Sequence, residues 1–269
     1  MDPLAPLIAN LQADGRPRVW SLVITVFGDS VQPRGGTVST AHLQRLLGRI
    51  GIEAGALRTA LSRLARDGWV SSQRDGRLSY YTLTPEGTAR FSDATNLIYA
   101  PARQHAPKRW RIALEPQADP MAPSLNGLAL RPADTGAMLP PADFALHGTL
   151  DALAPHIRAQ LLAPGLLTAL ERLQNDLQSL AHSSAALPPL DAAAARVLLV
   201  HRWRRLVLRG PELPTPLLPE TWQGQSPRAA VAQAWHALMP AAESWWAGQS
   251  DADLPPMPAA SAALARRFM

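Results

Sequence analysis

The sequence has no cysteine, and this absence excludes disulfide bonds, thiolate catalysis and zinc sites that use cysteine ligands. The seven histidines form no H-x-x-x-H pair, the spacing that would put two metal ligands on one face of a helix. Lysine is also scarce, because Lys108 is the only one and arginine supplies the remaining positive charge. We therefore expect neither a metal site nor a cofactor.

Long apolar segments are missing too. The longest apolar run, LVITVF at residues 22–27, is far too short to cross a bilayer. The first residues, MDPLAPLIANLQADG, have neither the basic segment nor the A-x-A cleavage site of a secretory signal, so we expect residues 1–14 to form a disordered leader. These features predict a cytoplasmic protein that does not bind membranes.

The positive charge is concentrated in the first part of the chain. Residues 1–112 hold 15 basic and 8 acidic side chains, whereas residues 113–269 hold 11 basic and 13 acidic ones. This asymmetry is typical of a chain in which one domain faces a polyanion such as double-stranded DNA.

The 269 residues are enough for two or three domains, and the expected fold class is α+β. Residues 15–100 are dense in periodic elements separated by turn residues, which predicts one compact domain. Residues 101–160 contain three strand-like segments, RWRIALE, NGLALRP and FALHGTL, which predict a small mixed α/β domain. Residues 161–269 carry long Ala- and Leu-rich helical patterns broken by proline, and we expect a helical domain there.

The segment GALRTALSRLARDGWV, residues 55–70, predicts an amphipathic helix with a basic outer face. At about 100° per residue, Leu57, Leu61 and Leu64 fall on one stripe. Short side chains let a helix enter the major groove, and arginine offers paired donors to guanine or positive charge to phosphates. We therefore expect DNA contacts from the residues of the opposite face, which are Arg58, Thr59, Ser62, Arg63 and Arg66.

The preceding segment predicts the first helix of a helix-turn-helix. Ser39 or Thr40 can cap a helix that runs to about residue 49, and Gly51 ends that helix just before the basic one.

The following segment, WVSSQRDGRLSYYTL, predicts two strands joined at Asp75-Gly76, a pair suited to a tight hairpin turn. Arg74 and Arg77 flank the tip of this hairpin. A hairpin of this kind directly after a basic helix is typical of the wing of a winged helix, and we expect both arginines to contact the minor groove or the phosphates.

Several blocks in this order resemble the PaaX family, which are repressors of phenylacetate-degradation operons. The blocks are FGDSVQPRGG, ALRTALSRLARDGWV, GRLSYYTLTPEG, LVHRWRRLVLRGPELPTPLLPETW and ALMPAAE, and the resemblance covers about residues 18–99 and 192–243. It implies an N-terminal winged helix, a central ferredoxin-like domain similar to the Cas2 fold, and a helical C-terminal domain. It also implies a homodimeric repressor that an acyl-CoA thioester, typically phenylacetyl-CoA, releases from its DNA operator.

The middle of the chain departs from this family pattern. The family's central domain usually opens on a segment like W-D-G-R-W, where this chain has APKRW, and residues 115–150 are few for a full ferredoxin-like unit with two helices. We therefore expect a truncated central domain.

The stretch VITVFGDSV, residues 23–31, has a second interpretation as the strand and turn that present the nucleophile of a GDSL-type esterase, which would be Ser30. A serine hydroxyl needs a histidine base with its aspartate, usually as D-x-x-H, and no D-x-x-H occurs in the chain. We therefore expect no catalytic residue and no enzymatic activity. In the preferred interpretation the stretch ends a helix, and Asp29 and Arg34 belong to the winged-helix scaffold or to a phosphate contact. The second possibility adds Arg34 to the expected DNA-binding residues.

The segment LDAAAARVLLVHRWRRLVLRG, residues 190–210, predicts a buried helix that nevertheless carries arginines. Buried guanidinium groups need anionic partners, which leaves two alternatives. The arginines pair with carboxylates of the same domain, or His201, Arg204 and Arg205 form the site for the CoA phosphates or for a dimer contact.

These observations leave three function classes: a PaaX-like DNA-binding repressor, which we favour, a GDSL-like hydrolase, and a winged-helix protein-interaction module that does not bind DNA.

Overall fold

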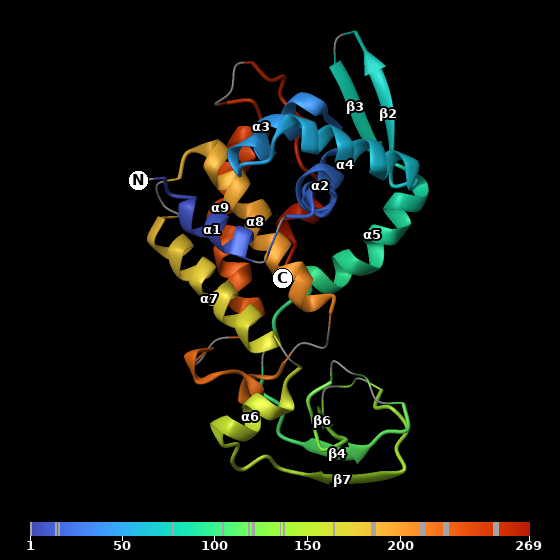
Figure 1. The fold of residues 1–269 in the computed structure, drawn as a ribbon, viewed down its shortest axis with the longest axis vertical. Helices are drawn as coiled ribbons and strands as arrows, with labels where there is room; N and C mark the ends of the chain where they lie inside the picture. Colours follow the sequence, from blue (N-terminus) through green and yellow to red (C-terminus); the bar gives the residue numbers. More distant parts are fainter. Residues whose placement is uncertain are drawn as a thin grey trace.

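The computed structural model describes residues 2–269 except for 14, 16, 77, 104, 118, 120–121, 135, 137, 164, 184–186, 210–212, 223–225 and 250–252. Figure 1 shows helices packed together over most of the long axis, a hairpin at one end and a small sheet at the other. The combination of helices with two antiparallel sheets confirms the expected α+β class. Among the described residues, no helix is both long and apolar enough to cross a membrane.

Helix α2 (Val19–Val26) is buried along most of its length. Its helical path continues beyond Gly28, first as a wider π turn over Phe27–Val31 and then as a 3-10 turn over Gln32–Arg34. Gly35 ends the path with φ of 87°, a left-handed conformation that favours glycine. The FGDS stretch is therefore part of a helix end, as expected, but the end lies several residues later than the sequence pattern indicates.

Two consecutive helices follow, α3 (Thr40–Arg49) and α4 (Ala54–Arg66), joined by a short turn at Gly51, whose φ is 84°. The Ser39 hydroxyl accepts a hydrogen bond from the backbone N–H of His42 at 3.2 Å, which identifies Ser39 as the helix cap. These two elements confirm the expected helices and their order.

A three-stranded antiparallel sheet stands beside the two helices, with strand order β1-β3-β2. The β2-β3 hairpin turns at Gly76, which has φ of 58°, and projects beyond the helices in Figure 1. Helix α5 (Pro85–Ile98) then leads away from the sheet. The strands are β1 (Thr37–Ser39), β2 (Val70–Asp75) and β3 (Leu78–Leu83).

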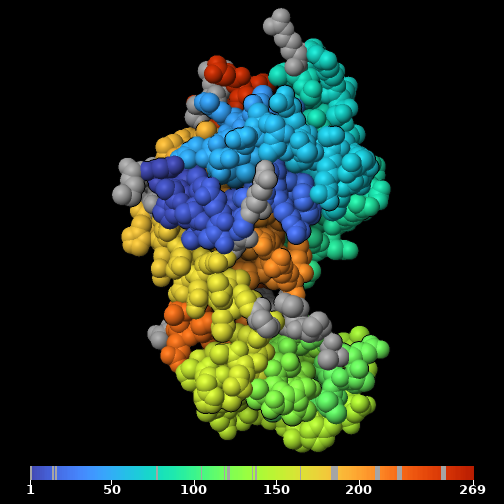
Figure 2. Space-filling view, viewed as in Figure 1, coloured from blue at the N-terminus to red at the C-terminus, as the bar shows by residue number. Residues whose placement is uncertain are grey.

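The middle of the chain forms a separate four-stranded antiparallel sheet, with strand order β5-β6-β4-β7. Its strands are β4 (Trp110–Leu114), β5 (Ser124–Leu125), β6 (Leu128–Pro132) and β7 (Phe144–Gly148), and they confirm the three expected strand segments. No helix lies between β4 and β7 in the part of the chain that the structure describes. Figure 2 shows this sheet (green) at the opposite end of the molecule from the surface of α3 and α4.

One face of this sheet is apolar and exposed. The register places Ile112 opposite Leu130 and Leu146, so their side chains share a face. The large apolar side chains that remain 36–59% exposed on it are Ile112, Leu114, Leu128, Phe144 and Leu146. We call these five residues the apolar sheet face.

The last third is helical, as expected, and its central helix α8 (Pro189–Val207) is buried over most of its length. Helix α8 packs against α7 (Leu166–Ser183) and α9 (Pro227–Trp246), but also against α2, α3 and α5. The helical third and the N-terminal region therefore share one apolar core. The last part of the chain also contains two short helices and two 3-10 turns. These are α6 (Pro155–Leu161), α10 (Ala262–Ala265), η4 (Thr215–Leu217) and η5 (Glu220–Trp222).

The expectation of a disordered leader at residues 1–14 is wrong. Residues Ala5–Ala13 form helix α1, which packs against α7 and α8. Leu4, Leu7 and Leu11 are buried, and the Asn10 amide donates to the Asp176 carboxylate at 2.6 Å. The spacing of these leucines gives the helix one apolar face, and that face is covered by helices that come much later in the chain.

A buried carboxylate joins the N-terminal region to the helical third. Asp29, in the π turn after α2, forms ion pairs with Arg196 of α8 at 2.8 Å and with Arg267 near the C-terminus at 3.3 Å. Its oxygens also accept hydrogen bonds from the Tyr99 hydroxyl at 2.8 Å, the Trp235 indole N–H at 3.0 Å and the Ser30 hydroxyl at 3.0 Å. Burial opposes ionisation of Asp29, but the two arginines and the hydrogen bonds from Trp235 and Tyr99 outweigh it and lower the pKa of the carboxyl.

We expect Asp29→Asn to lower the free energy of unfolding by about 3–5 kcal/mol, because two buried arginines would lose their shared counter-charge. Urea denaturation at neutral pH measures this loss. The matched control is Asp93→Asn on the exposed side of α5, which should stay within about 0.5 kcal/mol of the wild type. Equal stability of the two variants would contradict the structural role of Asp29.

Candidate DNA interface and an adjoining arginine cleft

Helix α4 is divided into a buried and an exposed face, as the sequence predicts. Leu57, Ala60, Leu61 and Leu64 are buried against the core. The five residues expected to contact DNA lie together on the exposed face, and they are Arg58, Thr59, Ser62, Arg63 and Arg66. Asp67 follows the helix and lies 3.5 Å from the guanidinium groups of both Arg63 and Arg66, so the exposed face still has an excess of positive charge.

Arg63 also contacts the first turn of α2. Its guanidinium carbon lies 5.7 Å from the centre of the Trp20 ring, within the range of a cation–π interaction. Trp20 is half-buried. The position of one arginine on the exposed face of α4 is therefore linked to the position of this indole.

The β2-β3 hairpin places Arg74 near its tip. Arg74 is exposed, and its Nε donates to the carbonyl of Gly76 at 3.2 Å, within the same turn. Arg77, the second arginine expected at the tip, lies outside the described residues.

The expectation that Arg34 contacts DNA is contradicted by its burial. Arg34 is 3% exposed, forms an ion pair with Glu243 of α9, and donates to the carbonyl of Ser30. Burial and the nearby positive charge of Arg196 lower the pKa of Arg34 to about 10, so it remains charged at neutral pH. Arg34 is therefore part of the scaffold and not a phosphate contact, because its ion pair with Glu243 connects the end of the α2 path with α9.

Ser30 is buried, and its hydroxyl is hydrogen-bonded to two side chains of the core. It is 1% exposed, its hydroxyl donates to the Asp29 carboxylate at 3.0 Å, and it accepts from a guanidinium N–H of Arg196 at 3.0 Å. A nucleophilic serine needs a histidine base within hydrogen-bond reach and access to substrate. The hydroxyl of Ser30 is instead held between a carboxylate and a guanidinium inside the core.

Of the three residues expected to bind an effector, His201 and Arg205 line the same cleft, whereas Arg204 forms its hydrogen bonds within the protein. His201 is 5% exposed and its Nδ1 lies 3.1 Å from the Thr25 hydroxyl. Burial, followed by the charges of Arg204, Arg205 and Arg202, lowers the pKa of His201 to about 3, so the ring is neutral at physiological pH. Arg204 donates to the Ser21 carbonyl at 3.0 Å and also to the Ser21 hydroxyl.

The alternative of carboxylate partners is confirmed for two arginines of α8. Arg202 forms a buried ion pair with Asp176 of α7, and Arg196 forms ion pairs with Asp29 and Glu243. Arg205 is half-buried and lines a cleft.

This cleft, which we call the arginine cleft, has a volume of about 250 Å³ and lies between the start of α2 and the end of α8. Its wall includes three arginines, Arg18, Arg205 and Arg209, together with Trp20 and Ser21. No aspartate or glutamate is among the described residues that line it. It therefore offers concentrated positive charge next to the indole that contacts Arg63 of α4.

Sequence reasoning missed Arg18, Trp20 and Arg209. Arg209 follows Arg205 by four residues, which places both on the same side of a helix, and this spacing was a usable signal. Arg18 and Trp20 come from a segment nearly two hundred residues away, and no local pattern connects them with α8.

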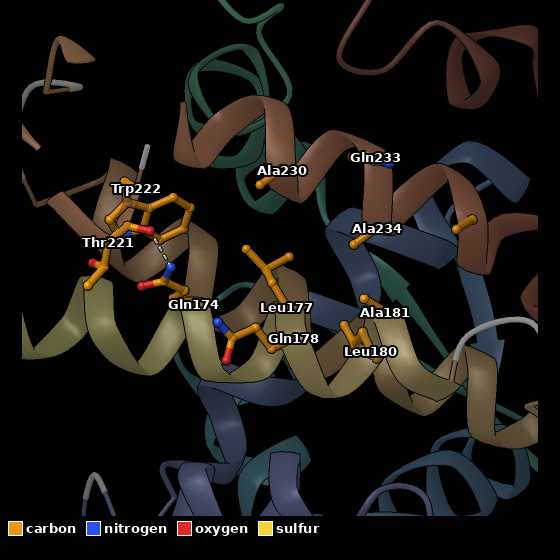
Figure 3. A pocket seen from close by; sticks show the side chains of 11 residues that line it. Gln174, Leu177, Gln178, Leu180, Ala181, Thr221, Trp222, Ala230, Gln233 and Ala234 are labelled. Atoms are coloured by element: carbon orange, nitrogen blue, oxygen red, sulfur yellow. Dashed lines mark hydrogen bonds between the residues drawn. The ribbon is translucent and has the colours of Figure 1, made fainter. Parts of the chain in front are cut away.

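A second, larger pocket of about 500 Å³ lies between α7, α9 and η5 (Figure 3). The Gln174 amide donates to the carbonyl of Thr221 at 2.6 Å along one wall, and Trp222 and Leu177 supply apolar surface. The residues described as lining it include no charged side chain, so this pocket suits an uncharged group and offers nothing to a phosphate.

Comparison with known proteins places the chain in the class of transcriptional regulators. The family model described as PaaX-like protein matches residues 18–87, and that of the PaaX-like protein C-terminal domain matches residues 166–248. The transcriptional repressor PaaX of Escherichia coli (strain K12) is 27% identical over 281 residues, covering 92% of this chain and 89% of that protein. Among solved structures, an uncharacterized protein from Mycobacterium tuberculosis is 21% identical over 75% of this chain and 88% of its own, with a TM-score of 0.43.

The chain belongs to the PaaX-like family. The two matched segments together span more than half of it, and they contain α4, the β2-β3 hairpin and α8. The resemblance drawn from the sequence blocks is thereby confirmed.

The depressed pKa of His201 makes stability depend on pH. The unfolded chain takes up the histidine proton near pH 6.5 and the folded chain only near pH 3, so stability is complete above about pH 6.5 and falls as the pH drops below it. We expect this residue to cost the wild type about 2 kcal/mol between pH 7 and pH 5. Urea denaturation of the wild type and of His201→Gln at both pH values isolates the effect, because all other titrating groups are shared. An equal loss in both proteins would show that His201 is protonated in the folded state.

Proposed function

We propose that the protein is a sequence-specific DNA-binding repressor and that α3, α4 and the β2-β3 hairpin form its winged helix-turn-helix. The observation that carries this proposal is the exposed face of α4, where three arginines and two short hydroxyl side chains lie together with nothing covering them among the described residues. An exposed helix of this composition fits the major groove. The name of the E. coli relative, a transcriptional repressor, supports the same conclusion.

The hairpin supports the winged-helix assignment. It follows α4 directly, its tip lies beyond the helices, and Arg74 is exposed there (Figure 1). In this arrangement α4 reads base edges, while the hairpin contacts backbone phosphates or the minor groove, which fixes orientation and carries little sequence information.

We further propose that the middle sheet is a reduced ferredoxin-like domain. The strand order β5-β6-β4-β7, with every neighbouring pair antiparallel, is the order of a ferredoxin-like sheet. In that fold two crossover helices cover one face of the sheet, and here the described residues that connect β4 with β5 and β6 with β7 form loops instead.

The apolar sheet face supports a homodimer. Monomeric proteins rarely expose a contiguous patch of large apolar side chains, and a twofold axis would place this patch against its own copy. The sheet lies at the far end of the molecule from α4, so the dimer we propose has two arms that each end in a winged helix. Its half-sites on DNA would be separated by a whole number of helical turns, each about 34–36 Å.

The effector that we propose is an acyl-CoA thioester such as phenylacetyl-CoA, whose binding releases the DNA. This proposal rests on the family membership and on the charge of the arginine cleft, to which Arg205 contributes. His201 also lines the cleft, although its Nδ1 lies within hydrogen-bond reach of Thr25, whereas Arg204 forms its hydrogen bonds with Ser21.

We expect Arg58→Ala to weaken specific DNA binding by about 1–3 kcal/mol and to relax discrimination at one base pair, because a base-contacting arginine is lost. Arg74→Ala should instead weaken binding evenly across sequences and lower the salt dependence by about one unit of slope. Fluorescence anisotropy with labelled duplexes at several salt concentrations measures both effects.

The matched control is Arg109→Ala, which removes an exposed arginine at the other end of the molecule and should leave affinity unchanged. If Arg58→Ala and Arg63→Ala bind DNA as tightly as this control, α4 is not the recognition helix. A protein-interaction module with the same shape would show no DNA affinity with a steep salt dependence.

For the dimer, we expect Leu146→Lys to raise the dimer dissociation constant at least about 10-fold, because a charge would be buried in an apolar contact. Analytical ultracentrifugation measures the shift. Ala145→Lys is the control, since it adds the same charge to the opposite face of the same exposed strand. Dimers that are unaffected by Leu146→Lys would exclude this face as the interface.

A further inference from the structure

Two neighbouring residues after α10 are inserted into the core between exposed ones. Arg267 and Phe268 are 8% and 7% exposed, whereas Arg266 before them and Met269 after them are exposed. The insertion uses a backbone conformation that an aromatic residue rarely adopts, because Phe268 has φ of 64°. A strained conformation of this kind persists only where the surrounding contacts hold it. This residue pair is therefore held as a ligand is held, by a site that the rest of the protein forms.

The Arg267 guanidinium binds the π turn that follows α2. It donates to the carbonyls of Gly28 at 2.7 Å and Asp29 at 2.6 Å, and it lies 3.3 Å from the Asp29 carboxylate. Its central carbon lies 3.9 Å from the centre of the Tyr99 ring. A guanidinium presents several donors in a rigid plane, whereas the ammonium of lysine is a compact point charge. The contacts therefore require an arginine and not merely a positive charge.

Phe268 occupies the aromatic side of the same site. Its backbone N–H donates to the Tyr99 carbonyl at 2.8 Å. The centre of its ring lies 5.2 Å from that of Tyr99 and 5.8 Å from that of Trp235, separations at which aromatic rings attract one another. We call the residues that hold the pair the latch site, and they are Gly28, Asp29, Tyr99 and Trp235.

We propose that the latch site is a binding site for an arginine followed by an aromatic residue, and that its occupation by Arg267 and Phe268 positions α2 for DNA binding. Asp29 belongs to the helical path that continues α2, and α2 packs against α4. Arg267 is a positioning residue, because it acts on DNA binding only through α2. This inference rests on the proposed function, since it names what sets the affinity of the same DNA-binding surface.

The direction of the effect follows from the contacts. Without Arg267 the Asp29 carboxylate keeps Arg196 as its ion-pair partner, but the two carbonyls of the turn lose the guanidinium donors. The end of the α2 path then becomes free to move, and α4, which packs on α2, loses a fixed orientation. A binding surface that is no longer preorganised binds more weakly. By linkage, DNA strengthens binding of the arginine–aromatic pair by the same factor by which the pair strengthens DNA binding.

The role of Arg267 is tested in the full chain by replacing each of two neighbouring arginines. We expect Arg267→Ala to weaken DNA binding roughly 5- to 150-fold, the usual range for coupled sites, and Arg266→Ala to leave the affinity nearly unchanged. Arg267→Lys keeps the charge beside Asp29 but not the planar donors, so it should remain folded and still lose DNA affinity. Circular dichroism shows that each variant is folded during the DNA titration. Affinity of Arg267→Lys equal to that of Arg266→Ala would overturn the positioning role.

Recognition by the latch site is tested by supplying the pair from outside. The double variant Arg267→Ala/Phe268→Ala removes both inserted side chains, and the peptide LARRFM repeats residues 264–269. We expect calorimetry to detect binding of this peptide and fluorescence anisotropy to show that it restores DNA affinity, whereas the control peptide LARAAM does neither. Peptide binding should tighten in the presence of DNA by the same factor as the restoration. Absence of LARRFM binding, or equal restoration by LARAAM, would overturn the proposal.

Failure of the latch site and failure of the proposed function give different results. A wild-type chain that binds DNA, together with an Arg267→Lys variant that equals Arg266→Ala, retains the function and loses the latch. A wild-type chain that binds no DNA, together with a double variant that binds LARRFM but not LARAAM, loses the function and retains the latch site as a peptide-binding site.

Discussion

The carboxylate of Asp29 is the point on which the arrangement of the molecule depends. It lies in the π turn at the end of α2, is buried, and receives Arg196 from α8, Trp235 from α9, Tyr99 from the end of α5 and Arg267 near the C-terminus. An ionised carboxylate in the core is costly unless several donors surround it, so these distant segments must all be in place together. The N-terminal region and the helical third consequently form one packed unit.

This unit includes both α4 and α8. Helix α2 lies between them, since it packs against α4 on one side and against α8 on the other. Arg204 of α8 holds Ser21 of α2, and the neighbouring Trp20 contacts Arg63 of α4. Two neighbouring residues of α2 therefore contact both the end of α8 and the exposed face of α4.

The arginine-rich composition serves two physical roles that the sequence alone does not separate. Arg34, Arg196 and Arg267 are buried and neutralise carboxylates, whereas Arg58, Arg66 and Arg74 are exposed at one end of the molecule. The second group was predictable from local patterns, because Arg58 and Arg66 alternate with buried leucines along α4 and Arg74 lies beside the turn of the hairpin. The first group was not, because the partner of Arg34 is Glu243, 209 residues later in the chain.

Other elements were predictable from the sequence where neighbouring residues determine them, and were not predictable where contacts with distant segments do. Helix α3, with Ser39 as its cap, and the β2-β3 hairpin followed from short-range signals. Helix α1 was taken for a disordered leader because its leucines are covered only by α7 and α8. Only part of the arginine cleft could be predicted. Arg205 was a candidate because it lies in α8, whereas Arg18 and Trp20 come from a distant part of the chain.

The most direct test of the account is selection of bound sequences from random double-stranded DNA by the purified full chain. The account predicts an enriched motif of two inverted half-sites separated by a whole number of helical turns, and loss of the enrichment when the exposed arginines of α4 are replaced by alanine. A pool that shows no enriched motif, or a motif that survives those replacements, would contradict the claim that α4 reads DNA.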